Sequence, residues 1–363
     1  MPFAASSRSN GGWQPPVNVP RLNLVQFAAG SRSNGSDGAG GMMAQSVAMS
    51  RNLLLALFLL AGAVPALAAE PTPRWQKSPA ELATSVSRIR AGEDLTPEAW
   101  PSGARVAVAL SFDVDTELVW LGDSGEESPS TMSRGEYGAR AGLPRVLRLL
   151  SKHDIPASFF IPAMSMELHP EIVPAIQADP RHEIGFHSYA HENPLQLSSA
   201  DERAAYEKGL ALFEKHVGER PLGFRSAAWD LTPATIGIVE SLGFTYDSSL
   251  MADDRPYRLM SDGKPSALVE LPVEWILDDW PYFQLDWADG PIALRSAPDV
   301  LSIWKAEFDG AYEEKTLFLL TMHPQVIGHR YRMQMLDELI TYMKSKPGVW
   351  FATHGEVAEY VDR

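Results

Sequence analysis

No cysteine occurs in this chain of 363 residues. Its absence excludes disulfides, thiol nucleophiles and thiolate zinc sites, so any metal ion must be bound by His, Asp or Glu. Positive charge is also scarce, since the formal net charge is −15. A chain without a basic surplus has no general attraction for phosphate backbones, which argues against nucleic acid as a partner.

Long apolar runs are scarce as well, and the one at 53–64 follows Arg51 and precedes an Ala-Leu-Ala ending. A positive start, roughly a dozen apolar residues and small residues at the end are typical of a secretory signal peptide. The run is shorter than the about 20 residues of a membrane span. We interpret residues 49–69 as a signal peptide, with a retained N-terminal anchor as the alternative. We therefore expect an exported protein, periplasmic or extracellular, that is not stably inserted in the membrane after cleavage.

The segment before this run, residues 1–48, is rich in Gly, Ser and Asn. Such a composition buries too little apolar surface to offset the entropy of ordering. We predict that it is disordered, or that it is a mis-assigned extension and translation begins at Met49, Met42 or Met43.

After a lead-in segment at 70–101 with one expected helix at 79–91, residues 102–363 alternate between two kinds of pattern. Strands are predicted at 106–112, 157–161, 183–186, 222–225, 268–273, 317–322 and 349–352. Helices are predicted at 143–152, 199–217, 232–243, 298–312 and 332–345, the second opened by a capping box at 199–202 and the third by Thr232-Pro233. This alternation predicts one α/β domain with a closed or nearly closed barrel, in which chemistry collects at the carboxyl ends of strands.

Polar side chains do follow these strands. The first strand ends in Asp113, Asp115 and Glu117. Three carboxylates beside a buried strand repel one another unless a positive group is present, which a metal ion would supply. A solvated acidic loop is the alternative.

Two histidines, His187 and His191, follow the third strand, four residues apart. On a helical turn they point the same way, at a spacing that suits two ligands of one ion. The pair is weak evidence alone, but together with Asp115 it gives a His₂Asp set that leaves a coordination position open. Asp113 then lies beside the metal as the general base.

Two further strand ends carry candidates for the chemistry. His323, followed by Pro324, is the candidate general acid, with a histidine lining the core as the alternative. Arg225 could orient Asp113 by pairing with it, or could form a structural salt bridge with Asp230.

Aromatic residues near strand ends suggest a substrate surface. Trp229 with Asp230 follows one strand, and Trp280 and Tyr282 follow another. Aromatic faces suit sugar rings, although such segments are equally often packed loops. His354 also follows a strand and could lie just outside the site.

Together these motifs resemble the polysaccharide deacetylase family, also called the NodB-homology or carbohydrate esterase 4 group. The resemblance runs from about Val106 to the C-terminus through four segments, SFDVDTE, HSYAH, FRSAAWD and LTMHP. It implies an irregular (β/α)7 barrel in residues 102–363. By the same match Asp113 is the base and Arg225 its tether, His323 is the acid, and Asp115, His187 and His191 bind a divalent metal, most often Zn²⁺.

The match departs from the usual pattern in two places. Val114 separates two aspartates that are adjacent in most members, and Ala227 and Ala228 replace part of the third motif. These changes resemble the branch that includes Helicobacter-type peptidoglycan deacetylases and allantoinase-like cyclic amide hydrolases.

The resemblance implies a metal-dependent hydrolase of non-peptide C–N bonds. The expected substrate is an N-acetylated glycan such as peptidoglycan, because an exported location favours cell-wall material. A small cyclic imide or ureide is the first alternative, and a secreted glycan-binding protein without catalysis is the second. Relatives in this branch tend to assemble, so a homo-oligomer is also expected.

Overall fold

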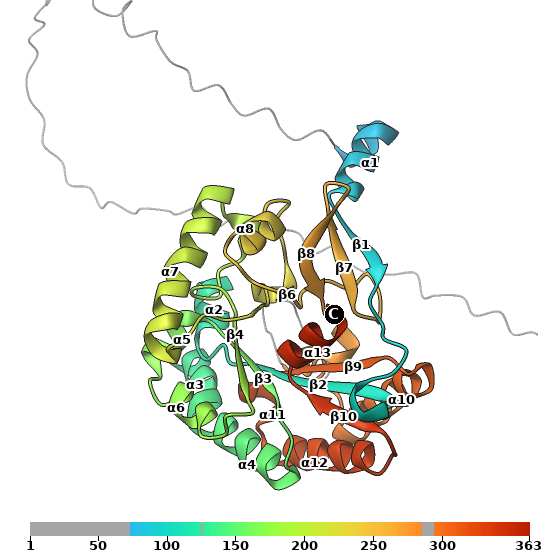
Figure 1. Ribbon diagram of the computed structural model, residues 1–363. Coiled ribbons are helices and arrows are strands. Elements are labelled where there is room, and N and C mark those ends of the chain that lie inside the picture. Colours follow the sequence, from blue (N-terminus) through green and yellow to red (C-terminus); the bar gives the residue numbers. More distant parts are fainter. Residues whose placement is uncertain (1–72, 124, 126, 285–293) are drawn as a thin grey trace, which may run out of the picture. The chain divides into compact units, whose positions relative to one another are not determined.

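The computed structural model of the protein describes residues 73–123, 125, 127–284 and 294–363 (Figure 1). The predicted disordered segment 1–48 and the predicted signal peptide 49–69 lie outside the described residues. Within the described residues, no helix is both long and apolar enough to cross a membrane.

The described part of the chain alternates between strands and helices. The strands are β1 (Ile89–Asp94), β2 (Val106–Asp113), β3 (Ser158–Ile161), β4 (Glu183–Phe186), β5 (Gly223–Phe224), β6 (Tyr246–Asp247), β7 (Tyr257–Ser261), β8 (Lys264–Glu270), β9 (Leu317–Met322) and β10 (Val349–Ala352). The α-helices are α1 (Pro79–Ser87), α2 (Leu118–Asp123), α3 (Pro129–Tyr137), α4 (Leu143–His153), α5 (Ala163–Leu168), α6 (Ile172–Gln177), α7 (Ser199–Val217), α8 (Thr235–Ser241), α9 (Trp280–Phe283), α10 (Ala297–Glu314), α11 (Pro324–Ile327), α12 (Arg330–Lys344) and α13 (His354–Val361).

The parallel strands form a curled sheet in the order β8-β6-β5-β4-β3-β2, and β9 pairs with the other edge of β2. Between β8 and β9, the described residues contribute one isolated bridge, from Asp278 to Thr321. The long helices α4, α7, α10 and α12 lie outside the sheet (Figure 1). The predicted irregular (β/α)7 barrel is therefore confirmed, with β10 added beside the first half of β2.

The alternation along β2 decides which side chains face the barrel interior. Val108, Leu110 and Phe112 pack into the large apolar cluster between strands and helices. Ala107 and Ala109 pack into the smaller cluster inside the barrel. Because successive residues of a strand face opposite sides, Ser111 and Asp113 continue the interior face. The same alternation directs Arg225, after β5, and His323, after β9, into the interior.

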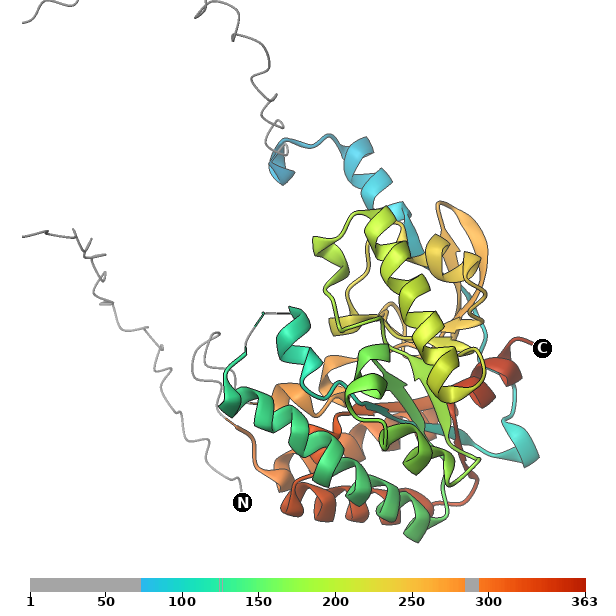
Figure 2. The same ribbon diagram turned by 90° about the vertical axis from the view of Figure 1, so that its left-hand side faces the viewer.

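The lead-in segment differs from its prediction. The helix expected at 79–91 ends at Ser87, and residues 89–94 form β1, which pairs antiparallel with β7. No residue of α1 is buried, so the helix depends on its Ser78–Glu81 capping box and not on packing. Figures 1 and 2 show α1 at the far end of the β1–β7–β8 extension.

The predicted capping box of α7 and the predicted start of α8 are wrong, although α7 itself spans the predicted residues 199–217. The N-cap of α7 is Ser198, whose Oγ accepts from the N–H of Asp201, because Glu202 is buried and accepts from Thr232 and Thr235 instead of capping. α8 begins at Thr235, and Thr232-Pro233 forms the turn before it.

A buried carboxyl pair joins β6 to β8. Asp247 and Glu270 are register partners, and both are fully buried. Asp247 Oδ1 and Glu270 Oε1 accept from donors of Ser249 and Leu250, whereas Asp247 Oδ2 and Glu270 Oε2 have no donor. Burial, together with the adjacent Asp247 carboxylate, raises the pKa of Glu270 well above its usual range. We infer that the two carboxyl groups share one proton.

The variant Glu270→Gln should flatten the pH dependence of stability. A raised folded-state pKa means that the contribution of Glu270 is fully present below the pKa of an unfolded glutamate, about 4.3, and is lost as the pH rises through the folded value. An amide at this position donates to Asp247 at every pH. Urea midpoints measured from pH 5 to 9 should fall less in this variant than in the wild type or in the exposed control Glu219→Gln. Equal declines in all three proteins would contradict the shared proton.

Candidate active site

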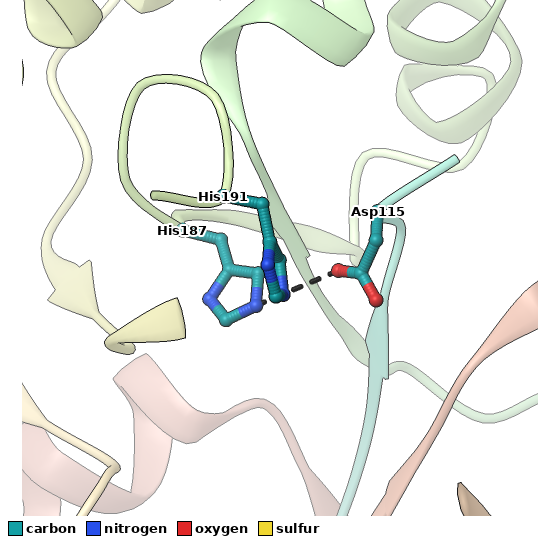
Figure 3. A group of neighbouring side chains, drawn as sticks. All are labelled: Asp115, His187 and His191. Atoms are coloured by element: carbon teal, nitrogen blue, oxygen red, sulfur yellow. Dashed lines mark ion pairs between the residues drawn. The ribbon is translucent and has the colours of Figure 1, made fainter. Parts of the chain in front are cut away.

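The predicted metal ligands converge inside the barrel. Asp115 follows β2, and His187 and His191 follow β4 (Figure 3). Each is at most 3% exposed, and one ligand atom from each lies within 4.8 Å of the other two. Such a set of three, without a fourth protein ligand, is typical of catalytic metal sites.

The protonation of the two histidines suits a metal. The backbone carbonyl of Arg225 lies 2.8 Å from His187 Nδ1, so this nitrogen carries the proton and donates it. His187 Nε2 then presents its lone pair 3.5 Å from Asp115 Oδ1. Burial lowers the pKa of His191 to about 4, which keeps its ring neutral. Neutral imidazole is the form that binds a metal.

Asp115 provides a test of the same fit. Its Oδ2 accepts from Gln325 Nε2 at 3.2 Å, but its Oδ1 is buried and has no hydrogen-bond donor. A buried carboxylate oxygen without a donor is costly, and a cation between Oδ1 and the histidine rings would compensate for it. The residues present therefore fit a divalent cation.

The two histidines are not on a helical turn, which corrects that part of the prediction. The residues from 187 to 191 form a tight loop with positive φ at Ser188 (65°) and His191 (58°). Gly122 in α2 makes room for this loop, because a Cβ there would lie 2.4 Å from the carbonyl oxygens of Ala190 and His191. Spacing alone did not distinguish a helical turn from this loop.

Asp113 is held as a carboxylate by Arg225. Both side chains are at most 1% exposed, and Arg225 Nη1 donates to Asp113 Oδ1 at 2.7 Å. Burial would raise the pKa of Asp113, but the guanidinium of Arg225 and the nearby His323 hold it below its usual value. Arg225 does not pair with Asp230, which is exposed. Asp113 can therefore accept a proton.

His323 has the opposite character. Its Nδ1 lies 2.7 Å from Asp279 Oδ1, and its backbone N–H donates to Asp279 Oδ2 at 3.1 Å. Burial lowers the pKa of His323, but Asp278 and Asp279 outweigh it and raise that pKa well above the usual range. The ring is thus protonated, with Nε2 facing Asp115 Oδ2 at 3.8 Å. His323 can donate a proton from Nε2.

Asp279 is not predicted from the sequence, because its neighbours Trp280 and Tyr282 mark this segment as aromatic. The useful signal is the acidic pair Asp278–Asp279, which follows β8 after a short 3₁₀ helix at Trp275–Leu277. The bridge from Asp278 to Thr321 of β9 brings that pair beside His323.

The remaining candidates take varied positions. Trp280 packs edge-on to His323, with ring centroids 5.1 Å apart, and so lies beside the candidate general acid. Trp229 is 6% exposed and stacks on Trp275, which is 42% exposed. Tyr282 donates to the carbonyl of Ile276 and packs near Trp304, away from the metal ligands. Glu117, the third carboxylate after β2, lies apart from the centre and pairs with His169.

The geometry agrees with comparisons to known proteins. A family model described as polysaccharide deacetylase matches residues 126–246. The peptidoglycan deacetylase of Helicobacter pylori is 30% identical over 280 residues, covering 70% of this chain and 95% of the relative. A crystal structure of a Mycobacterium smegmatis protein classed with the polysaccharide deacetylases is 34% identical, with a TM-score of 0.68 over 73% of this chain and 93% of that chain. The crystal structure of the Puue allantoinase is 27% identical, with a TM-score of 0.63 over 72% and 91% of the two chains.

The chain therefore belongs to the polysaccharide deacetylase family, a family of hydrolases, which confirms the resemblance found in its motifs.

The variant Asp279→Asn should lower the pKa of His323 in the metal-free protein, because it removes a carboxylate that stabilises the imidazolium. NMR titration of the histidine Cε1–H signals measures this directly. His169, whose pKa is raised by its hydrogen bond with Glu117, serves as the internal control and should titrate unchanged. An unaltered His323 titration would show that Asp279 does not set its protonation.

Proposed function

We propose that this protein is a metal-dependent deacetylase that hydrolyses the acetamido group of an N-acetylated glycan such as peptidoglycan. The observation that carries the proposal is the pairing of an ionised base with a protonated acid beside a candidate metal site. Arg225 keeps Asp113 ionised at 2.7 Å, and Asp279 keeps His323 protonated at 2.7 Å. Two titratable groups whose pKa values are pushed apart are typical of an acid and a base with separate roles.

Asp115, His187 and His191 would hold the metal, and Zn²⁺ suits two imidazoles and one carboxylate. When bound, the metal polarises the amide carbonyl and makes water a stronger nucleophile. The chain's own residues move the protons. Asp113 accepts a proton from the water molecule while the water oxygen bonds to the acetyl carbon. Arg225 holds Asp113 in place during this step.

His323 then completes the reaction. Its Nε2–H passes to the amide nitrogen as the C–N bond breaks, so that nitrogen leaves as an amine and the acetyl group as acetate. Asp279 stabilises the imidazolium before this transfer, and Trp280 packs against the ring. Placing a proton donor on the leaving nitrogen avoids the expulsion of an amide anion.

The cell-wall substrate is supported by the relative from Helicobacter pylori, which is a peptidoglycan deacetylase, and by the signal-peptide pattern at 49–69. We propose that the mature protein is exported and acts in the periplasm or outside the cell. Trp275 stacks on Trp229 and is partly exposed, so the pair supplies an aromatic surface of the kind that sugar rings contact.

Acetate release from peptidoglycan and N-acetylglucosamine oligomers by the zinc-loaded protein tests this function. Asp113→Asn keeps the side-chain shape but cannot accept the proton, so kcat should fall about 10²–10⁴-fold. Chelation of the metal should abolish release, and added Zn²⁺ should restore it. Release that persists at the wild-type rate in Asp113→Asn would remove this residue from the role of base.

A cyclic imide or ureide is the second candidate substrate, favoured by the likeness to the Puue allantoinase. The same acid and base would hydrolyse a C–N bond of the ring. The new carboxylate and the released nitrogen group would then remain part of one molecule. Hydrolysis of hydantoin-type compounds can be monitored by the change in absorbance as the ring opens. This assay, run beside the acetate assay, distinguishes the cyclic substrate from the glycan. Hydrolysis of the ring without acetate release from glycans would replace the deacetylase assignment, whereas glycan binding without either activity would favour the non-catalytic alternative.

A further inference from the structure

Gln325 contacts a candidate metal ligand. It lies in α11, is 5% exposed, and donates from Nε2 to Asp115 Oδ2 at 3.2 Å. The other atom of its amide, Oε1, is buried and has no hydrogen-bond partner. The side chain thus makes one polar contact and leaves one polar group unsatisfied.

The orientation of this amide follows from its neighbour. If the amide were reversed, Oε1 would face the carboxylate of Asp115, and two acceptors would repel each other. The NH₂ group must therefore face Asp115, and Oε1 is left against Gly138. An apolar side chain of similar volume, such as methionine, would fill this space without a buried unsatisfied acceptor. Packing alone does not account for a glutamine here.

The backbone around Gln325 is shaped for a close approach. Residues 138–142 form a π-helix between α3 and α4, an irregularity frequent at functional sites. A Cβ at Gly142 would lie 2.0 Å from the carbonyl oxygen of Pro324, and one at Gly138 would lie 3.1 Å from Gln325 Cβ. Arg145 also donates to the carbonyl of Gly328 at 2.8 Å, holding the far end of α11. Gly138, Gly142 and the π-helix that contains them thus allow α11 to pack close beside Asp115.

We propose that Gln325 is a positioning residue for the metal ligand Asp115. By occupying Oδ2, it fixes the carboxylate rotation and leaves Oδ1, which has no other donor, as the oxygen that faces His187 at 3.5 Å. Hydrogen bonds to a ligating carboxylate orient it before the metal arrives and so raise affinity. This inference rests on the proposed metal dependence of the enzyme and deepens it.

The variant Gln325→Met tests the inference without measuring catalysis. Zn²⁺ affinity is determined by competition with a chromogenic chelator, for the wild type, for Gln325→Met and for the matched control Gln334→Met. Gln334 is an exposed residue of α12, so its variant should bind as the wild type does. We expect Gln325→Met to bind about 10–100-fold more weakly. Far-UV circular dichroism and thermal unfolding of the metal-free proteins should show that the variant remains folded.

The outcomes separate this inference from the proposed function. Wild-type affinity in a folded Gln325→Met overturns the role of Gln325 and leaves the enzyme assignment intact. A wild type that binds no metal overturns both. If Gln325→Met does not fold, Gln325→Asn takes its place, because it keeps the amide but is one methylene too short to reach Asp115. It should weaken binding to a similar degree, and unchanged affinity in it would likewise overturn the role.

Discussion

The site depends on one buried cation, the guanidinium of Arg225. It is fully buried, and its nitrogens donate to Asp113, Ser111 and Ser248 and contact His354 Nε2 at 3.2 Å. Removing one partner of such a buried ion pair typically costs about 3–5 kcal/mol, since the other charge remains unpaired. The backbone carbonyl of Arg225 also fixes the tautomer of His187. The ionisation of Asp113, the proposed base, and the lone pair of a candidate metal ligand therefore depend on the same residue.

A second layer of polar residues supports Arg225 from inside the barrel. Burial, together with the nearby guanidinium, lowers the pKa of His354 well below its usual value, so its ring is neutral. The bare Nε2 can accept from Arg225, while Nδ1 faces Ser158 Oγ at 3.2 Å, and Ser158 donates to Glu183 at 2.6 Å. Charge is thus balanced by Asp113, and the remaining donors of the guanidinium are satisfied by neutral groups.

Sequence patterns predicted the barrel well because its strands are apolar runs covered on both faces. The strands at 183–186, 317–322 and 349–352 have the predicted bounds. β6 was missed because two residues are too short to show periodicity, and β1 because its pairing with β7 is a tertiary contact. In the site, motif residues at strand ends could be named, whereas Asp279 and Gln325 act through contacts between distant segments. No local pattern reports a hydrogen bond between Gln325 and Asp115, which are 210 residues apart.

The register between β2 and β9 fixes the relative positions of Asp113 and His323, but it does not constrain the loops around them. Phe112 is paired with Met322, so the next residues, Asp113 and His323, leave adjacent strands at the same level. Their backbones are held at the spacing of neighbouring strands, about 4.8 Å. Insertions in the surrounding loops can reshape the space above this pair without changing that spacing. In the proposed enzyme, the shape of the substrate space would therefore depend on loop residues, while the level of Asp113 and His323 depends on the paired strands.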